Sequence, residues 1–278
     1  MGKEFLDRNL ALEAVRVTEA AALSSSFHMG RGNEKAADQA AVNAMREFLN
    51  NLSIDGTVVI GEGERDKAPM LYIGEKVGMG GPKVDIALDP LEGTTITAKG
   101  GENALSVLAM AEQGGFLHSP DIYMHKIAYG KKYESLDIDP ESPSDEIVKN
   151  FAKYSGIKIE NIVVCILDRP RHKELIDKVR SIGARIKLIP DGDVSAVIAT
   201  SFEDSGVDIY MGIGGSPEGV LAAAALRCIG GKIYTKLIFD NDKQIERAKL
   251  MGISDPNRIY LTNDLASGDV MFSATGVT

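Results

Sequence analysis

The second half of the chain alternates apolar runs, polar loops and helical segments, and this alternation constrains the fold more than any other feature. The apolar runs are residues 161–167, 185–189 and 207–212, and the helical segments that follow are residues 173–182, 194–202 and 220–229. Such a repeat predicts a largely parallel β-sheet, in which the loops after the strands gather at one edge. We therefore expect the loops at 168–172, 190–193 and 214–219 to form one pocket.

Weaker patterns predict the remaining elements. Further strands are expected at 56–60, 84–88, 104–111, 126–129 and 232–239, helices at 4–26, 34–49 and 242–251, and a strand-like tail at 267–278. A polar, proline-containing stretch at 133–145 precedes the expected domain boundary. We expect an N-terminal α+β domain at 1–153 and a C-terminal α/β domain with substrate-binding loops at 154–278.

The stretch Val84–Thr97 joins an apolar run to two acids, a glycine and hydroxyls. We expect strand pairing to stop at Asp89–Pro90, because proline has no N–H to donate. Glu92 then precedes Gly93–Thr94, where a glycine allows close backbone approach. Alone, this pattern is equally typical of a capped turn and of a site, so acids elsewhere must decide.

Acidic residues in two other segments of the chain favour a metal site over a capped turn. Glu62 follows the strand at 56–60 and is flanked by glycines, and three acids within five residues there repel unless a cation is present. Asp38 sits among alanines on the helix at 34–49, where a solvated helix acid is the simpler reading. The candidate metal ligands are Asp38, Glu62, Asp89, Glu92 and Glu218.

Five carboxylates on separate elements are the oxygen ligands that Mg²⁺ and Mn²⁺ prefer. Zinc is a weak candidate, because the chain has only 4 His and 2 Cys. Two close divalent ions would polarise a phosphate ester and lower the pKa of a bound water, so hydrolysis of a phosphomonoester is the natural reaction. The Thr94 hydroxyl would orient that water, and the N–H groups of Gly93–Thr94 would face the phosphate if a helix starts there.

Charged residues in the later loops suggest contacts to the rest of a substrate. Arg169 and Arg171 would bind a second anionic group, because the guanidinium fork suits phosphate oxygens. Asp191 and Asp193 around Gly192 are equally consistent with hydrogen bonds to sugar hydroxyls and with a turn plus helix cap.

Composition excludes several classes of protein. The net charge of −9 without a basic block, no Trp and 6% aromatic residues argue against a nucleic-acid binder. No apolar run is long enough to cross a membrane, and the first residues lack a secretory apolar region. Cys165 and Cys228 lie in apolar runs and are expected to be buried thiols of a cytoplasmic protein. The late glycine run 212–215 is a poor dinucleotide motif, which ranks a dehydrogenase low.

Eight short motifs occur along the chain: GRG at 30–32, IDGTVVIGEGE at 54–64, APMLYIGEKVG at 68–78, DPLEGT at 89–94, PD-x-YM at 120–124, RPRH at 169–172, IPDGDV at 189–194 and GIGGSPEG at 212–219. Together they resemble the lithium-sensitive, metal-dependent phosphomonoesterase superfamily, and their sequences are similar to those of the bacterial class II fructose-1,6-bisphosphatases. The resemblance covers nearly the whole chain.

The resemblance implies a layered α/β/α/β/α sandwich with a mixed sheet followed by a largely parallel one. It implies Mn²⁺ or Mg²⁺ at the five carboxylates, Thr94 positioning the water, and Asp66 near the catalytic centre. Implied substrate contacts are Glu92, Gly93, Thr94, Tyr123, Arg169, Pro170, Arg171, Asp191, Gly192, Asp193 and Gly215.

The leading hypothesis is a phosphatase that hydrolyses the 1-phosphate of fructose 1,6-bisphosphate, in gluconeogenesis and growth on glycerol. Alternatives are a sedoheptulose-1,7-bisphosphatase, an inositol-monophosphatase-like or nucleotide 3′-phosphatase, and a non-catalytic phosphosugar-binding protein. We expect a homo-oligomer, either a dimer or a tetramer, with no nucleic-acid or membrane partner.

Overall fold

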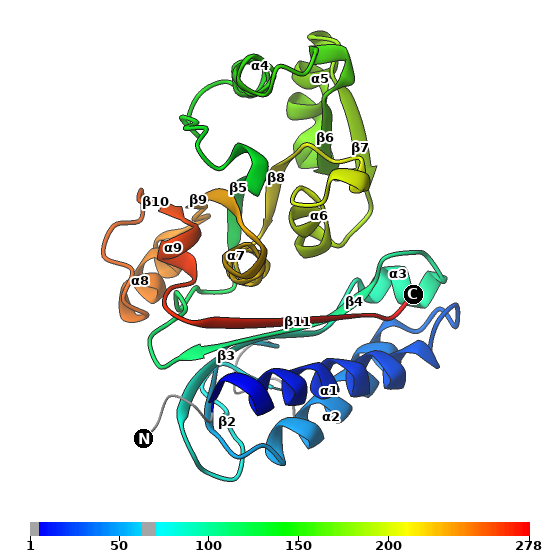
Figure 1. The fold of residues 1–278 in the computed structure, drawn as a ribbon, viewed down its shortest axis with the longest axis vertical. Helices are drawn as coiled ribbons and strands as arrows, with labels where there is room; N and C mark the ends of the chain where they lie inside the picture. The colour runs from blue at the N-terminus through cyan, green and yellow to red at the C-terminus, as the bar shows by residue number, and fades with distance from the viewer. Residues whose placement is uncertain (1–5, 63–70) are drawn as a thin grey trace. The chain divides into compact units, whose positions relative to one another are not determined.

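The computed structural model describes residues 6–62 and 71–278 and divides into two compact units (Figure 1). The first unit is built from the chain up to His118 and from Ala266–Thr278, and the second from Ser119–Leu265. The predicted domain boundary at 153/154 falls inside helix α4 (Ser144–Ser155). The compact units therefore divide at other residues than the predicted domains, and the last segment of the chain returns to the first unit.

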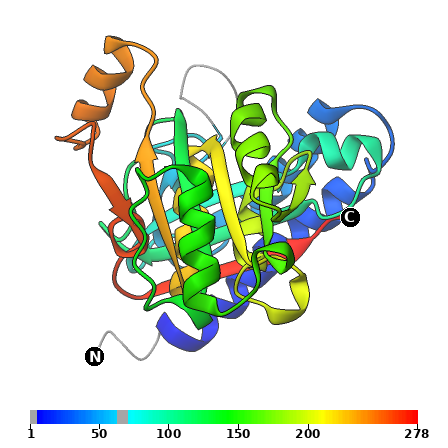
Figure 2. The same ribbon diagram turned by 90° about the horizontal axis from the view of Figure 1, so that it is seen from above.

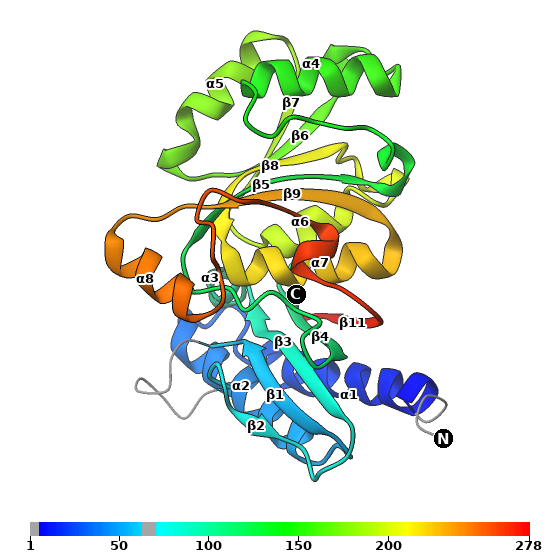
Figure 3. The ribbon, with the colours of Figure 1, turned by 90° about the vertical axis from the view of Figure 1, so that its left-hand side faces the viewer.

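The first unit contains a five-stranded mixed sheet with helices on one face. Its strands are β1 (Asp55–Ile60), β2 (Lys76–Val77), β3 (Lys83–Glu92), β4 (Leu105–Glu112) and β11 (Val270–Gly276), in the order β11-β4-β3-β1-β2, and its helices are α1 (Leu6–Ser26), α2 (Glu34–Asn50) and α3 (Thr94–Lys99). Only β1 and β3 are parallel among these neighbours. Helices α1 and α2 lie side by side beneath the sheet (Figure 3). Ala37, Ala41 and Met45 recur at four-residue spacing on α2 and are fully buried, so the small side chains allow close packing.

Strand β3 continues beyond the point where we expected it to end. It passes Pro90 and runs to Glu92, with an irregular register against β4 between Asp89 and Glu92. The expectation that pairing stops at Asp89–Pro90 was wrong. A proline is tolerated in a strand where the ladder is already broken by a bulge. The strand therefore runs two residues beyond Pro90, to Glu92, which directly precedes the N-cap glycine of α3.

Strand β11 closes one edge of the first sheet with residues from the far end of the chain. It pairs antiparallel with β4, from Val270 opposite Ala111 to Gly276 opposite Leu105. The Thr18 hydroxyl on α1 lies 2.8 Å from that of Ser273 and accepts a hydrogen bond of 2.9 Å from that of Thr275. The strand-like tail predicted at 267–278 is thus confirmed.

The second unit contains a six-stranded mixed sheet in the order β10-β9-β5-β8-β6-β7. Its strands are β5 (Tyr123–Gly130), β6 (Val163–Leu167), β7 (Arg185–Ile189), β8 (Ile209–Gly215), β9 (Gly231–Leu237) and β10 (Ile259–Leu261), and its helices are α4, α5 (Lys173–Ser181), α6 (Asp193–Ala199), α7 (Ser216–Ile229), α8 (Asp242–Leu250) and α9 (Thr262–Leu265). Strands β6, β7 and β8 are parallel, as the repeat predicts. Strand β5 lies antiparallel between β8 and β9, which makes the sheet mixed.

Helices cover both faces of the second sheet. One face packs against α4 and α5 through a cluster that includes Tyr129, Phe151 and Val179, and Figure 2 shows α4 across it. Helices α6 and α7 contact the opposite face. The α/β class is confirmed, and the layers, two in the first unit and three in the second, are those that an α/β/α/β/α sandwich requires.

The two cysteines differ in their environment. Cys165 on β6 is buried, as predicted, but Cys228 is exposed. The expectation for Cys228 was wrong because α7 is buried through Leu226 and exposes its last turn. In the part of the chain that the structure describes, we find no helix with the length and apolar character needed to span a membrane.

Candidate active site

Two predicted metal ligands lie at the same end of the first sheet because β1 and β3 are parallel. Ile60 on β1 is the register partner of Ala87 on β3, and Glu62 and Asp89 each follow two residues later. The Glu62 N–H donates to the carbonyl of Leu71 at 2.9 Å. One carboxylate oxygen of Asp89 accepts a 3.0 Å hydrogen bond from the Leu91 N–H at the bulge. The carboxyl ends of two adjacent strands thus each present an acid.

The turn after β3 places a buried acid beside a helix start. Glu92 is buried, Gly93 adopts the left-handed conformation with φ of 96°, and α3 begins at Thr94. A Cβ at Gly93 would lie 3.1 Å from the Ile96 side chain, so both the backbone angle and the tight packing favour glycine. The expected helix start after DPLEG is therefore observed, with Thr94 as its first residue.

Asp38 is brought towards this turn by the loop that precedes α2. The N–H groups of Gly30 and Gly32 donate to the carbonyls of Thr97 and Ala98 on α3, at 2.9 and 2.8 Å. Helix α2 also contacts both α3 and β3. Burial raises the pKa of Asp38. Elements bearing Asp38, Glu62, Asp89, Glu92 and Thr94 therefore meet at one end of the first sheet.

The first unit supplies ligands of the right chemistry for a hard divalent cation, since every candidate is a carboxylate. Within residues 6–62 and 71–278, however, no group of three or more His, Cys, Asp or Glu side chains is close enough to hold a metal ion. Asp66, the acid expected near the catalytic centre, lies outside the described residues. The donors come from neighbouring elements, without a preformed cage in the described part.

The second unit gathers the predicted substrate-binding loops at one edge of its sheet. The loops after β6, β7 and β8 follow parallel strands, and Tyr123 at the start of β5 is the register partner of Gly215 at the end of β8. The residues at this edge are Tyr123, Arg169, Pro170, Arg171, Asp191, Gly192, Asp193, Gly215 and Glu218. The expected gathering of these loops is observed within the unit.

Arg171 is held in one orientation by the end of β8. Its Nε and Nη2 both donate to the carbonyl of Ile213, at 3.1 and 2.7 Å. Its guanidinium carbon lies 4.7 Å from the centre of the Tyr123 ring, in a cation–π contact. Two hydrogen bonds and a ring contact orient the cation, and the arginine side chain remains exposed.

Arg169 ties the loop after β6 to the loop after β7. Its Nη1 donates to the carbonyl of Pro190, and its Nη2 lies 3.9 Å from a carboxylate oxygen of Asp191. Gly192, with φ of 87°, then precedes α6 as its N-cap, without a side-chain hydrogen bond to the helix. The two charged loops are therefore joined by one arginine.

Asp193 forms a buried ion pair that was not predicted. Its Oδ2 accepts a 2.7 Å hydrogen bond from Nζ of Lys126 on β5, and both side chains are almost fully buried. The Tyr210 hydroxyl donates to the same oxygen at 3.4 Å. A Cβ at Gly214 would overlap that oxygen, so glycine makes room for the carboxylate. Because this carboxylate is committed to Lys126, a substrate contact at position 193 would come from the main chain.

Glu218 is partly buried in the first turn of α7. Burial and, secondly, the nearby charge of Asp193 raise its pKa. Among the described residues its Oε2 is buried without a hydrogen-bond partner, and a Cβ at Gly215 would overlap that oxygen. The other four predicted metal ligands belong to the first unit.

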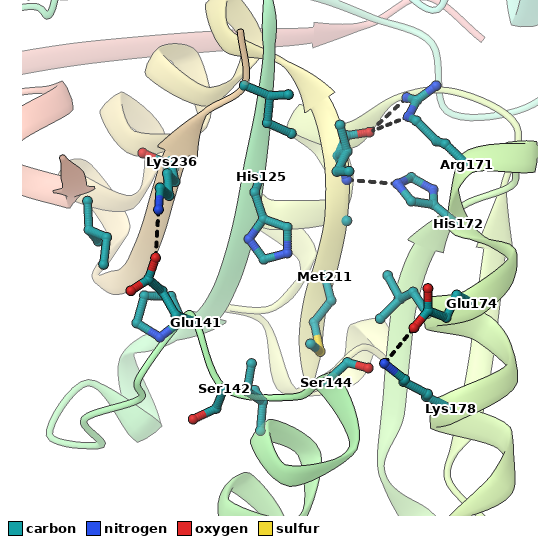
Figure 4. A pocket seen from close by; sticks show the side chains of 18 of the residues that line it. His125, Glu141, Ser142, Ser144, Arg171, His172, Glu174, Lys178, Met211 and Lys236 are labelled. Carbon is teal, nitrogen blue, oxygen red and sulfur yellow. Dashed lines mark hydrogen bonds and ion pairs between the residues drawn. The ribbon is translucent and has the colours of Figure 1, made fainter. Parts of the chain in front are cut away.

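A cavity of about 580 Å³ lies on the face of the second sheet that carries α4 and α5 (Figure 4). Two ion pairs flank it, Lys236 with Glu141 at 2.6 Å and Lys178 with Glu174 at 2.7 Å. Arg171, His172, His125 and Met211 also line it. Burial lowers the pKa of His125. Arg171 and His172 thus reach β8 from the rim of this cavity.

Sequence reasoning missed two polar residues near the site. Lys126 interrupts an otherwise apolar strand, which is a signal for a buried charge that needs a partner. His172 belongs to the RPRH motif, but it was the one residue of that motif to which no role was assigned.

Comparisons with known proteins match nearly the whole chain to one family. Residues 8–278 match the family model described as bacterial fructose-1,6-bisphosphatase, glpX-encoded. The fructose-1,6-bisphosphatase 1 class 2 of Escherichia coli strain K12 is 46% identical over 98% of this chain and 84% of its own length. The D-fructose 1,6-bisphosphatase class 2/sedoheptulose 1,7-bisphosphatase of Crocosphaera subtropica is 43% identical over 98% of this chain and 86% of its own.

A solved structure titled an extragenic suppressor, from Pyrococcus furiosus, matches more distantly. The TM-score is 0.35 and the identity 11%, over 68% of this chain and 69% of that one.

Proposed function

Because the chain belongs to the family of bacterial, glpX-encoded fructose-1,6-bisphosphatases, we propose that it hydrolyses the 1-phosphate of fructose 1,6-bisphosphate to fructose 6-phosphate and inorganic phosphate. The observation that carries this proposal is the family match over residues 8–278, which includes both sheet edges described above. The reaction is that of a divalent-metal-dependent phosphomonoesterase. It supplies the hexose phosphate that gluconeogenesis and growth on glycerol require.

The acids of the first unit would hold the divalent ion, which we propose to be Mn²⁺ or Mg²⁺. Asp38, Glu62, Asp89 and Glu92 come from elements that meet at one end of the first sheet, and Glu218 remains our prediction for a further ligand. When bound, such an ion polarises the phosphate and lowers the pKa of a water. Crowded carboxylates repel one another, so the ion also makes their approach favourable.

The turn into α3 would orient the reacting groups. Gly93 would allow the phosphate to approach the backbone closely. The Thr94 hydroxyl at the helix start would orient the attacking water through a hydrogen bond. Asp66, outside the described residues, remains a predicted member of this site. Thr94 is therefore the residue whose loss should lower kcat most selectively.

The second unit would recognise the remainder of the substrate. Arg171, fixed by Ile213 and Tyr123, offers its other N–H groups to a second phosphate. Arg169 and Pro170 belong to the same loop as Arg171. Gly192, Asp193 and Gly215 would offer backbone groups to the substrate. Asp191 is half-buried at the edge and suits a sugar hydroxyl.

Phosphate release measured with Mn²⁺ and with Mg²⁺, before and after chelation by EDTA, tests the proposal. We expect metal-dependent release from fructose 1,6-bisphosphate, with fructose 6-phosphate as the product. Arg171→Ala should raise KM for the bisphosphate far more than for fructose 1-phosphate, which lacks the second anion. Metal-dependent release from no sugar phosphate at all would favour a non-catalytic phosphosugar-binding protein.

A second substrate is favoured by one comparison. The Crocosphaera relative carries both activities in its name, so we propose that sedoheptulose 1,7-bisphosphate is also accepted. Comparing kcat/KM for the two bisphosphates decides this. Light scattering on the purified protein tests the predicted dimer or tetramer, and a cytoplasmic location remains our expectation from the sequence.

A further inference from the structure

Strands β6 and β8 separate before either one ends. Their ladder consists of Val164 with Ile209 and Cys165 with Tyr210, although β6 continues to Leu167 and β8 to Gly215. Beyond these two pairs, the described residues of the two strands have no further register partners in each other. The substrate-binding edge is therefore built where direct strand pairing has already stopped.

The imidazole of His172 fills this opening. Its Nδ1 lies 2.7 Å from the carbonyl oxygen of Leu167, and its Nε2 lies 2.8 Å from the backbone nitrogen of Ile213. A carbonyl can only accept and an N–H can only donate, so Nδ1 carries the proton and Nε2 accepts. The ring thus links the end of β6 to β8 in a single neutral tautomer.

Arg171 and His172 form hydrogen bonds to the main chain of the same residue of β8, Ile213. Ile213 gives its N–H to His172 and receives two N–H groups of Arg171 on its carbonyl. Figure 4 shows both side chains reaching β8 from the same turn. Because the peptide groups of Ile213 are fixed by His172, the carbonyl that orients the Arg171 guanidinium is fixed as well.

The surroundings protect this arrangement. His172 is 1% exposed, and burial lowers its pKa, with the charges of Arg171 and Arg169 acting in the same direction. At Gly212, with φ of 156°, a Cβ would lie 3.2 Å from both Cε1 and Nε2 of the ring, so glycine leaves space for it. The site is built for a neutral imidazole.

We propose that His172 is a positioning residue, which fixes Ile213 and thereby holds the guanidinium of Arg171 where it binds the second phosphate of the substrate. It touches no reacting atom and acts only through Arg171. The identity of the anion rests on the proposed function, whereas the orientation of Arg171 does not.

Kinetics on His172→Phe and His172→Gln test the proposal, because Phe removes both polar ends of the ring and Gln restores one donor and one acceptor. For His172→Phe we expect KM for fructose 1,6-bisphosphate to rise roughly tenfold, the scale of one lost hydrogen bond, with kcat nearly unchanged. KM for fructose 1-phosphate should not change. His172→Gln should recover most of the loss.

The matched control is His125→Phe, which alters a second histidine lining the same cavity. Among the described residues the side-chain hydrogen bonds and ring contact of Arg171 go to Ile213 and Tyr123 and not to this imidazole, so KM should equal that of the unchanged protein. In an Arg171→Ala background, His172→Phe should add nothing further. An unchanged KM in folded His172→Phe, an equal rise for both substrates, or full additivity with Arg171→Ala would overturn the proposal.

A measurement independent of turnover separates this proposal from the proposed function. In ¹⁵N NMR of the unchanged protein, His172 should show a protonated Nδ1 and an unprotonated Nε2, and the Nε–H of Arg171 should be protected from exchange. The opposite tautomer would refute the geometry even if His172→Phe failed to fold. If the tautomer and protection are as expected but no bisphosphate is hydrolysed, the proposed function fails and the positioning role stands.

Discussion

Replacing Lys126 by methionine should destabilise the second unit strongly, because it leaves the buried carboxylate of Asp193 without its cationic partner. The side chain of Lys126 is 0% exposed and that of its partner Asp193 6% exposed, at 2.7 Å. Removing one partner of a buried ion pair costs about 3–5 kcal/mol, since the remaining charge is left uncompensated. The weak hydrogen bond from Tyr210, at 3.4 Å, is too long to replace the lysine.

Urea unfolding followed by circular dichroism measures this loss. With an m-value of roughly 2 kcal/mol per M, the midpoint of the transition should fall by about 2 M. Adding Asp193→Asn to Lys126→Met should recover much of the loss, because a neutral amide is far cheaper to bury than a carboxylate. The double variant thus separates the cost of the uncompensated carboxylate from the cost of altered packing.

The matched control removes an exposed pair of the same unit. Lys132 lies 3.4 Å from Glu203, with side chains 65% and 83% exposed, so Lys132→Met should cost less than about 1 kcal/mol. A loss of stability in Lys126→Met no greater than that in Lys132→Met would refute the claim that an uncompensated Asp193 carboxylate causes the loss. A double variant no more stable than Lys126→Met alone would refute it as well.

Three further predictions concern the same edge. Gly214→Ala should destabilise the protein by at least 1 kcal/mol, because the added Cβ overlaps the carboxylate of Asp193; thermal unfolding measures it, and an unchanged Tm would contradict it. The lowered pKa of His172 means that the unfolded state binds more protons below roughly pH 6.5, so stability should fall as the pH drops through that value; urea midpoints across pH should show a flatter profile in His172→Gln. Tyr123→Leu should raise KM for the bisphosphate a few-fold by removing the ring contact to Arg171, whereas Tyr123→Phe should not; equal effects of the two substitutions would exclude the ring contact.

Local patterns predicted much of the second unit. The runs that became β6, β7 and β8 alternate with helical segments, and this regularity alone placed their following loops at one edge. The insertion of β5 between β8 and β9 could not be read in this way, because antiparallel pairing with segments far along the chain leaves no periodic signal. Helix α4, amphipathic but adjacent to a proline-containing stretch, was read as a boundary.

The site was predicted less completely than the fold. Asp89 was recognisable because it directly follows the apolar run at 84–88, and Glu218 because it lies in the polar loop expected after the run at 207–212. Lys126 and Asp193 are 67 positions apart, and nothing local to either one indicates the other. The continuation of β3 beyond Pro90 was missed because a bulge depends on the partner strand β4 as well as on the proline.

The return of β11 to the first sheet bears on how the protein is made. Translation releases α1 early, but Ser273 on β11, which contacts Thr18 of α1, lies 255 positions later. Strand β4 therefore lacks its β11 neighbour until that segment has been synthesised. The segment Ser119–Leu265, by contrast, leaves the ribosome in one piece, with every strand of its sheet. We therefore expect Ser119–Leu265 to fold first on the nascent polypeptide, while the first unit is completed only when β11 emerges.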